Sequence, residues 1–176
     1  MPAANRFGLG LRSTENRLAE PNADWPSAFA LEATRLKAAL GDVIIAIEHY
    51  GSTSIPGLAA KPIIDLLVGV ADLSQAAQSS AVMAGLGYDE RGYDLVPGHH
   101  IFGHGEARTH LAHFVPHDSD FWRRPLIFRD RLRVSADLRE RYEALKRDLV
   151  ARHPNDRPAY TKAKGEFVLS VVRGEI

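Results

Sequence analysis

Hydrophobic periodicity divides the first part of the chain into one helix and two buried strands. Apolar residues recur near helical spacing over residues 26–40, after a capping Asp24 and before Gly41, which predicts a helix. Residues 43–50 form a short β-branched run, and residues 62–70 are apolar at nearly every position, as is typical of buried strands. The segment between them is too short for a crossover helix of ordinary length, which favours antiparallel or irregular pairing.

The pattern after residue 71 predicts another helix, several short strands and a helical C-terminal part. Asp72 can cap a helix that ends at the glycines within residues 85–87. Pro154 and Pro158 mark a break between the last two of the C-terminal helices. The strand-like segments are residues 88–90, 99–103 and 108–115, and the helical segments are residues 119–131, 135–152 and 157–172.

This order of elements predicts an α/β or α+β fold, with a mixed β-sheet of four or five strands, flanking helices and a helical C-terminal part. The length is natural for one domain, so we expect residues 1–176 to form a single domain. Residues 1–23 are polar and aperiodic and are expected to be a loosely ordered lead-in.

Composition excludes several classes of function. The chain has no cysteine, which excludes a disulfide framework, a thiol nucleophile and a Cys-ligated metal site. No apolar run reaches the roughly 18 residues of a membrane span, and the N-terminus lacks the apolar core of a signal peptide. We therefore expect a cytoplasmic protein with no membrane partner. The net charge of zero argues against nucleic acid as the partner.

The zero net charge conceals an asymmetry along the chain. Residues 1–118 contain 8 Lys or Arg against 13 Asp or Glu, and residues 119–176 contain 14 against 9, which gives −5 and +5. Two explanations stand side by side. The arginines can cover ordinary solvated helix faces, or they can form a basic wall that faces a phosphate-bearing ligand.

The segment that follows the first strand carries the clearest chemical signal. Gly51 lets a ligand approach the backbone closely, and Ser52, Thr53 and Ser54 place three hydroxyls beside free N–H groups, an arrangement that binds phosphates. A plain tight turn is the alternative. Asp65 lies inside the second apolar strand, where a carboxylate must be paired or must bind a cation. Oxygen ligation at Asp65 suits Mg²⁺ or Mn²⁺.

The stretches EHYGSTSIPGLAAKPIIDLLV, RTHLAHFV, WRRPLIFRDRLR, YEALKRDL and YTKAKGEFV, in this order, resemble the GrpB (UPF0157) family, a branch of the nucleotidyltransferase superfamily. The resemblance runs from about Trp25 to the end of the chain. It implies a Gly-Ser turn, an Asp-x-Asp motif on the next strand and a further carboxylate on a later strand, which together hold divalent metal for nucleotidyl transfer. Gly51, Ser52 and Asp65 match the first part, which makes Asp65 and Ser52 the candidate catalytic residues.

The remainder of that motif is missing. Leu67 stands where the second carboxylate would be, and the later strand offers Arg108, His110 and His113 in place of a carboxylate. The two histidines match the family's Arg-Thr-His-x-x-His stretch and could replace oxygen ligands, which would favour Mn²⁺ or Zn²⁺. Residues three apart point to opposite faces of a strand, so both can ligate one ion only across a bulge. A hydrogen-bonded core role is the alternative for each.

Further candidate ligands are charged residues near these motifs. Glu48 could be a second metal carboxylate or the partner of an Arg or Lys. The basic candidates for phosphate contact are Lys61, Arg108, Arg129, Lys162 and Lys164, with solvated surface cations as the alternative for each. Lys164 lies four residues after Tyr160, on the same face of a predicted helix.

These observations favour a metal-dependent, nucleotidyltransferase-like protein that binds a nucleoside triphosphate or a related phosphate ligand. The alternative is a binding or accessory module for a nucleotide or a coenzyme A-related ligand that has lost transfer, which Leu67 supports. A metal-dependent hydrolase built on the histidines ranks third. The chain has no Gly-x-x-x-x-Gly-Lys-Ser/Thr motif, so kinase activity is not expected.

Overall fold

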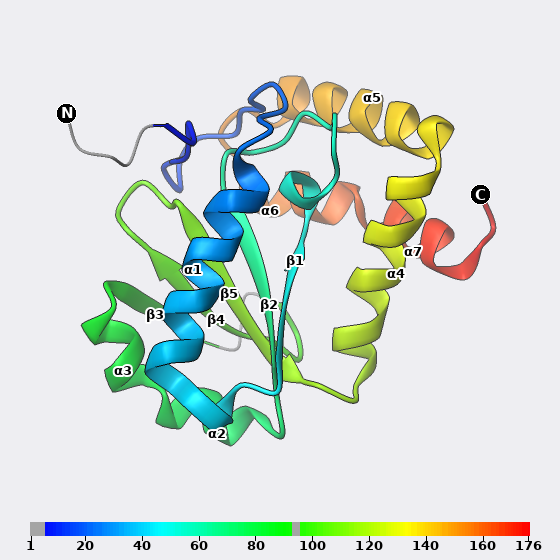
Figure 1. Ribbon diagram of the computed structural model, residues 1–176. Coiled ribbons are helices and arrows are strands. Elements are labelled where there is room, and N and C mark those ends of the chain that lie inside the picture. The colour runs from blue at the N-terminus through cyan, green and yellow to red at the C-terminus, as the bar shows by residue number, and fades with distance from the viewer. Residues whose placement is uncertain (1–5, 93–95) are drawn as a thin grey trace.

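The computed structural model describes residues 6–92 and 96–176, and its centre is a five-stranded mixed sheet in the order β1-β2-β5-β4-β3 (Figure 1). The strands are β1 (Ala46–Tyr50), β2 (Ile64–Val70), β3 (Tyr88–Gly92), β4 (His100–His104) and β5 (His110–Pro116). β2 and β5 are parallel, and the other neighbours are antiparallel. The expected mixed sheet and the antiparallel pairing of the first two strands are confirmed.

Three helices cover one face of the sheet. They are α1 (Trp25–Leu40), α2 (Leu73–Gln78) and α3 (Ser80–Gly85), and Figure 1 shows α1 crossing this face. Leu36 of α1 packs in one cluster with Leu66, Val68 and Phe114 of the sheet, all fully buried. A single helix was predicted over α2 and α3. The hydroxyl of Ser79 donates to a carbonyl one turn earlier, 2.8 Å away, a bond that competes with the helix ladder.

The C-terminal helices form a second core. They are α4 (Asp120–Val134), α5 (Ala136–Arg152), α6 (Arg157–Ala163) and α7 (Gly165–Arg173). Leu132, Tyr142 and Val171 from this part pack with Ile55 and Leu58 of the β1–β2 connection. The helices therefore hold that connection in place. The last predicted helix is divided between α6 and α7 before Gly165, a residue of low helix propensity.

The lead-in is more ordered than the sequence predicts. Leu11 is fully buried and pairs with Arg108, and the backbone N–H of Gly10 donates to the carbonyl of Pro62 at 2.9 Å. Ala19 pairs with Ala60 in a second isolated bridge. The prediction that this segment is loosely ordered is wrong. It rested on the absence of a hydrophobic pattern, whereas the segment is held by backbone hydrogen bonds, which do not depend on such a pattern. Residues 1–5 lie outside the described part of the chain.

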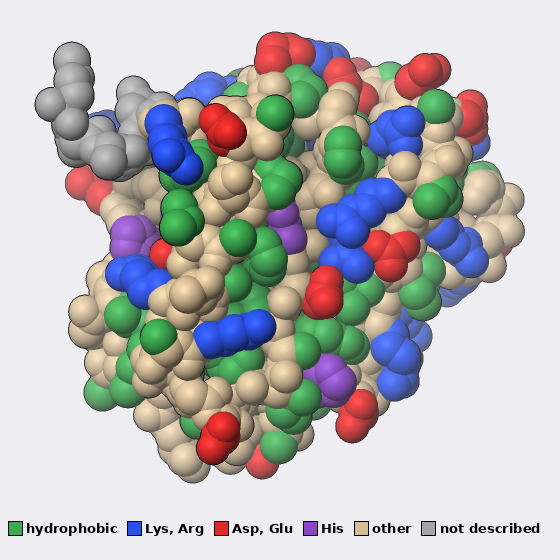
Figure 2. Space-filling model, in the orientation of Figure 1, with side chains coloured by type: hydrophobic (Ala, Val, Ile, Leu, Met, Phe, Trp, Pro, Cys, Tyr) green, Lys and Arg blue, Asp and Glu red, His purple; other side chains and the backbone are tan. Residues whose placement is uncertain are grey.

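Most arginines of α4 and α5 are engaged within the protein. Arg123 and Arg124 both pair with Asp120, and Arg147 pairs with Glu143. In Figure 2, Lys and Arg side chains on the α4 and α5 side lie next to Asp and Glu side chains. These contacts favour the ordinary explanation for much of the basic excess. None of the helices in the described ranges is long and apolar enough to span a membrane.

Candidate functional site

The end of β1 turns directly against the aspartate of β2. Gly51 has φ 73° and ψ −177°, a region that is open essentially only to glycine. A Cβ added to Gly51 would overlap Oδ2 of Asp65 and lie 3.1 Å from its Cβ and Cγ. The Gly-Ser turn and Asp65 therefore meet, as the sequence motif predicts, and only glycine fits between them.

Two of the three candidate hydroxyls are used inside the turn. Thr53 is buried, its Oγ1 lies 3.0 Å from Nε2 of His49, and the hydroxyl donates to the carbonyl of Ile63 at 3.3 Å. The Ser54 hydroxyl donates to the carbonyl of Gly51. The expectation that both bind phosphate is corrected accordingly. Ser52 is partly exposed, and its hydroxyl has no hydrogen bond to any residue that the structure describes.

Strand register places His113, and not His110, beside Asp65. Leu67 of β2 is the partner of His113 in β5, so Asp65, Leu67 and His113 share one face. His113 Nε2 lies 3.7 Å from Asp65 Oδ1. A third residue, His99, follows in line, because its Nδ1 lies 3.3 Å from Nδ1 of His113. His99 had no spacing that pointed to this site, and only the folded sheet brings it there.

His110 lies on the opposite face. Its partner in β2 is Ile64, and its Nδ1 lies 2.9 Å from the Thr109 hydroxyl. Burial lowers the pKa of His110 to about 4, so the ring is neutral at pH 7. The expectation that His110 could ligate a metal together with Asp65 is therefore corrected, because the sheet separates the two side chains.

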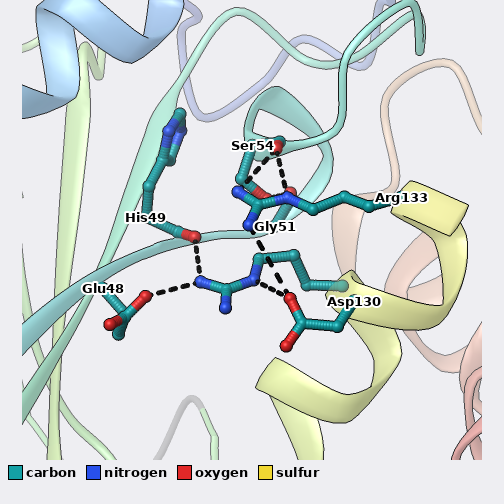
Figure 3. Close-up of polar contacts among 7 residues, drawn as sticks. Glu48, His49, Gly51, Ser54, Asp130 and Arg133 are labelled. Carbon is teal, nitrogen blue, oxygen red and sulfur yellow. Dashed lines mark hydrogen bonds and ion pairs between the residues drawn. The ribbon is translucent and has the colours of Figure 1, made fainter.

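Glu48 is engaged by an arginine. Arg129 Nη1 of α4 donates to Glu48 Oε2 at 2.7 Å and to the carbonyl of His49 at 3.0 Å. Arg133 lies one turn further along α4 and donates to the carbonyl of Ser54 at 2.9 Å and 3.1 Å (Figure 3). Of the two alternatives for Glu48, the structure shows the ion pair. Both arginines fix the backbone on either side of Gly51.

These side chains do not fit a resident two-metal centre. Asp65 is the carboxylate beside Gly51, whereas Leu67 is fully buried and His113 fills the neighbouring position on β5. Within the two described ranges, no group of three or more His, Asp or Glu residues is placed to hold a metal ion. One carboxylate does fit a Mg²⁺ ion that is brought by phosphates, because such ions use one or two carboxylates and otherwise water and phosphate oxygens.

Two of the five predicted basic phosphate contacts come together, whereas Arg129 pairs with Glu48 and Lys162 is exposed on α6. Lys61 Nζ lies 3.8 Å from the ring centroid of Tyr160, and Lys164 Nζ lies 4.5 Å from the same centroid. Burial, followed by the charge of Lys164, lowers the pKa of Lys61 to about 7. Arg108 is engaged elsewhere, since it forms a bidentate ion pair with Asp89, in which Nη2 lies 2.8 Å from Oδ2.

Comparison with known proteins agrees with the resemblance in the sequence. The family model for the GrpB protein matches residues 15–173. The UPF0157 protein YqkA of Bacillus subtilis is 38% identical over 148 residues, which are 84% of this chain and 43% of that protein. The chain thus spans less than half the length of that relative. A 75-residue stretch is 35% identical to a dephospho-CoA kinase of Mycolicibacterium paratuberculosis and covers 41% of this chain and 18% of that protein.

Solved structures show the same fold. The conserved protein GrpB from Enterococcus faecalis matches with a TM-score of 0.81 and 32% identity, over 90% of this chain and 96% of that chain. Cid1, solved in complex with its short product ApU, matches with a TM-score of 0.52 and 13% identity, over 76% of this chain and 43% of that chain. The second likeness concerns the fold alone, and it confirms the predicted nucleotidyltransferase-like sheet.

Proposed function

The chain belongs to the GrpB family, and from that premise we propose that it binds a nucleoside triphosphate, or a related phosphate ligand, together with a divalent cation in the manner of a nucleotidyltransferase. The observation that carries this proposal is the contact between Gly51 and Asp65. It puts a Gly-Ser turn and a partly exposed carboxylate side by side, an arrangement that supports binding of phosphates together with a cation.

Each part of the ligand has a matching group. The side chain of Asp65 is 27% exposed, so one carboxylate oxygen can reach a cation such as Mg²⁺ or Mn²⁺ that the phosphates bring with them. Ser52 supplies a hydroxyl and the backbone of the turn, and Lys61 supplies a positive charge next to the turn. Binding then rests on electrostatic neutralisation of the phosphates, and transfer would depend on how the acceptor is positioned.

A second candidate is a binding module that has lost transfer. Leu67 and His113 support it, because they occupy the places where a two-metal site would have its other carboxylates. The partial similarity to a dephospho-CoA kinase supports a coenzyme A-related ligand for such a module. The two candidates share the binding site and differ in whether a phosphoanhydride bond is broken.

The first experiment measures thermal unfolding of the wild type and of Asp65→Ala with each common nucleoside triphosphate and with coenzyme A, in Mg²⁺, Mn²⁺ or Zn²⁺. A ligand at 100 times its Kd adds about 2.7 kcal/mol of stability. Asp118→Asn is the matched control, since its side chain is 99% exposed. We expect a cation-dependent stabilisation of the wild type and of Asp118→Asn that Asp65→Ala lacks. A wild type that melts cooperatively and responds to none of these ligands would refute the proposal.

The second experiment separates transfer from binding. A nucleoside triphosphate found by thermal unfolding is labelled at its α-phosphate, and transfer of the label to water and to small hydroxyl and amine acceptors is followed together with release of pyrophosphate. Release that requires Asp65 supports a transferase. Binding without any release supports the module that has lost transfer.

A further inference from the structure

Three cations from two separate segments of the chain interact with one another through space, and two of them, Lys61 and Arg157, also interact with Asp65. Lys61 lies in the β1–β2 connection, whereas Arg157 and Lys164 lie at the two ends of α6. Lys164 and Arg157 both lower the pKa of Lys61 by charge repulsion, after burial, and Asp65 raises it. The three residues are therefore close enough to interact through space, and we refer to Lys61, Arg157 and Lys164 as the cation cluster.

The cation cluster is not neutralised by the protein. Across residues 6–92 and 96–176, none of its three members forms an ion pair with a carboxylate, although ion pairs are frequent on α4 and α5. Like charges that are held together without counter-ions repel each other, so the arrangement is costly in the absence of an anion. Asp65 acts on Lys61 and Arg157 as a negative charge nearby, and Glu15 acts on Arg157, but neither carboxylate forms an ion pair with a member of the cluster.

Arg157 has an unused donor. Its Nε donates to the carbonyl of Glu15 at 3.2 Å, which anchors the guanidinium against the N-terminal segment. Its Nη2 is shielded from solvent and has no hydrogen-bond partner in the described part of the chain. A guanidinium presents several N–H groups in a fixed plane that matches phosphate oxygens, so an anion can satisfy this donor.

Tyr160 holds the two lysines at fixed places. Its side chain is only 1% exposed, and both ammonium groups lie against its ring. Each lysine therefore loses part of the flexibility that an ordinary surface lysine keeps. Two ammonium groups and one guanidinium in fixed positions suit a ligand with several adjacent anionic oxygens better than a single carboxylate.

We propose that the cation cluster is a polyphosphate subsite, which binds the terminal phosphates of a ligand whose first phosphate lies at Gly51 and Asp65. This inference rests on the proposed function and narrows its ligand class to molecules with two or more linked phosphates. Arg157 belongs to this subsite and not to the Gly-Ser turn, and no sequence motif singled it out. Its replacement therefore tests the subsite separately from the turn. Inorganic tripolyphosphate and nucleoside triphosphates have linked terminal phosphates, whereas the two linked phosphates of coenzyme A lie between its two halves.

The experiment measures binding of tripolyphosphate, ATP and coenzyme A, each with Mg²⁺, by isothermal titration calorimetry. The variants are Arg157→Gln and Lys164→Gln, with Lys162→Gln as the matched control because Lys162 lies exposed on the same helix. We expect each cluster variant to weaken tripolyphosphate binding about tenfold or more, as loss of a charge-assisted hydrogen bond predicts, and Lys162→Gln to bind like the wild type. Whichever of ATP and coenzyme A shows the same losses is the better match to the natural ligand.

The outcomes separate this inference from the proposed function. ATP or coenzyme A binding that both cluster variants leave unchanged overturns the subsite and leaves the proposed function standing, as does nucleotide binding without any tripolyphosphate binding. Failure of the wild type to bind any of the three ligands overturns both. Thermal unfolding without ligand checks the fold. Lys164→Gln should melt close to the wild type, because it removes a like charge as well as one contact with the Tyr160 ring, and it carries the test if Arg157→Gln, which loses the hydrogen bond to the carbonyl of Glu15, fails to fold.

Discussion

Replacement of Gly51 by alanine tests the contact on which the site depends. With φ 73° and ψ −177°, any residue other than glycine at this position incurs a backbone strain of about 1–3 kcal/mol. The added Cβ would also overlap Oδ2 of Asp65, and rotation of that carboxylate away from its preferred conformation costs about 0.5–1.5 kcal/mol. Gly51→Ala should therefore lower the free energy of unfolding by about 2–4 kcal/mol and Tm by about 4–16 °C.

Gly57→Ala is the matched control for the backbone strain that an alanine causes at a positive φ. Gly57 also has a positive φ, 75°, but a Cβ built there meets nothing within 4 Å. Urea unfolding of Gly57→Ala therefore measures strain without the contact, and the additional loss in Gly51→Ala measures the overlap with Asp65. Combining Gly51→Ala with Asp65→Ala should recover part of that additional loss, because the overlapping oxygen is absent. Equal losses for the two glycine variants, or an unchanged loss in the Asp65→Ala background, would refute the contact.

Three further predictions concern buried polar groups. Burial lowers the pKa of Lys146 from 10.5 to about 7, so the unfolded chain binds more protons between these values and stability rises from pH 7 to pH 10.5. Lys61 contributes to the same rise because its pKa is also lowered to about 7, so Lys146→Met should make the rise smaller in urea unfolding at pH 7 and pH 10. Burial likewise lowers the pKa of His49 from 6.5 to about 4, so stability falls as the pH drops through this window, and acid titration of His49→Gln should give a shallower loss. The Tyr88 hydroxyl donates to Oε1 of Glu32 at 2.8 Å, so Tyr88→Phe should cost about 1.5–3 kcal/mol in urea unfolding, and a cost below about 0.5 kcal/mol would contradict the role of this bond.

Periodicity predicted the elements well because each strand and helix buries its own apolar residues. Residues 62–70 are apolar on both faces, and the observed β2 (Ile64–Val70) is the second strand of the sheet, covered on both sides. The short connection between β1 and β2 also predicted their antiparallel pairing correctly. Both predictions depend only on residues that are close to one another along the chain, so the sequence of one segment is enough to make them.

The composition of the site depended on contacts between distant residues. Whether the hydroxyl of Thr53 is available to a ligand depends on the carbonyl of Ile63, which accepts its proton, and on His49, whose Nε2 lies 3.0 Å from Thr53 Oγ1. The approach of His99 to His113 depends on how β4 and β5 pair. Neither relation has a spacing in the sequence, so residue type alone overestimated the free hydroxyls and missed the second imidazole.

The basic residues in the C-terminal part of the chain have two different roles. On α4, Arg129 and Arg133 donate to backbone carbonyls on either side of Gly51, and on α5, Lys146 donates to the carbonyl of Ala59, so these cations hold the β1–β2 connection in shape. Such bonds consume the donors and leave little for a ligand. The cation cluster beside α6 differs because its charges are neither paired with carboxylates nor fully hydrogen-bonded. The basic residues that hydrogen-bond to the β1–β2 connection and those of the cation cluster are thus separate sets. We expect loss of the first to impair folding and loss of the second to impair binding.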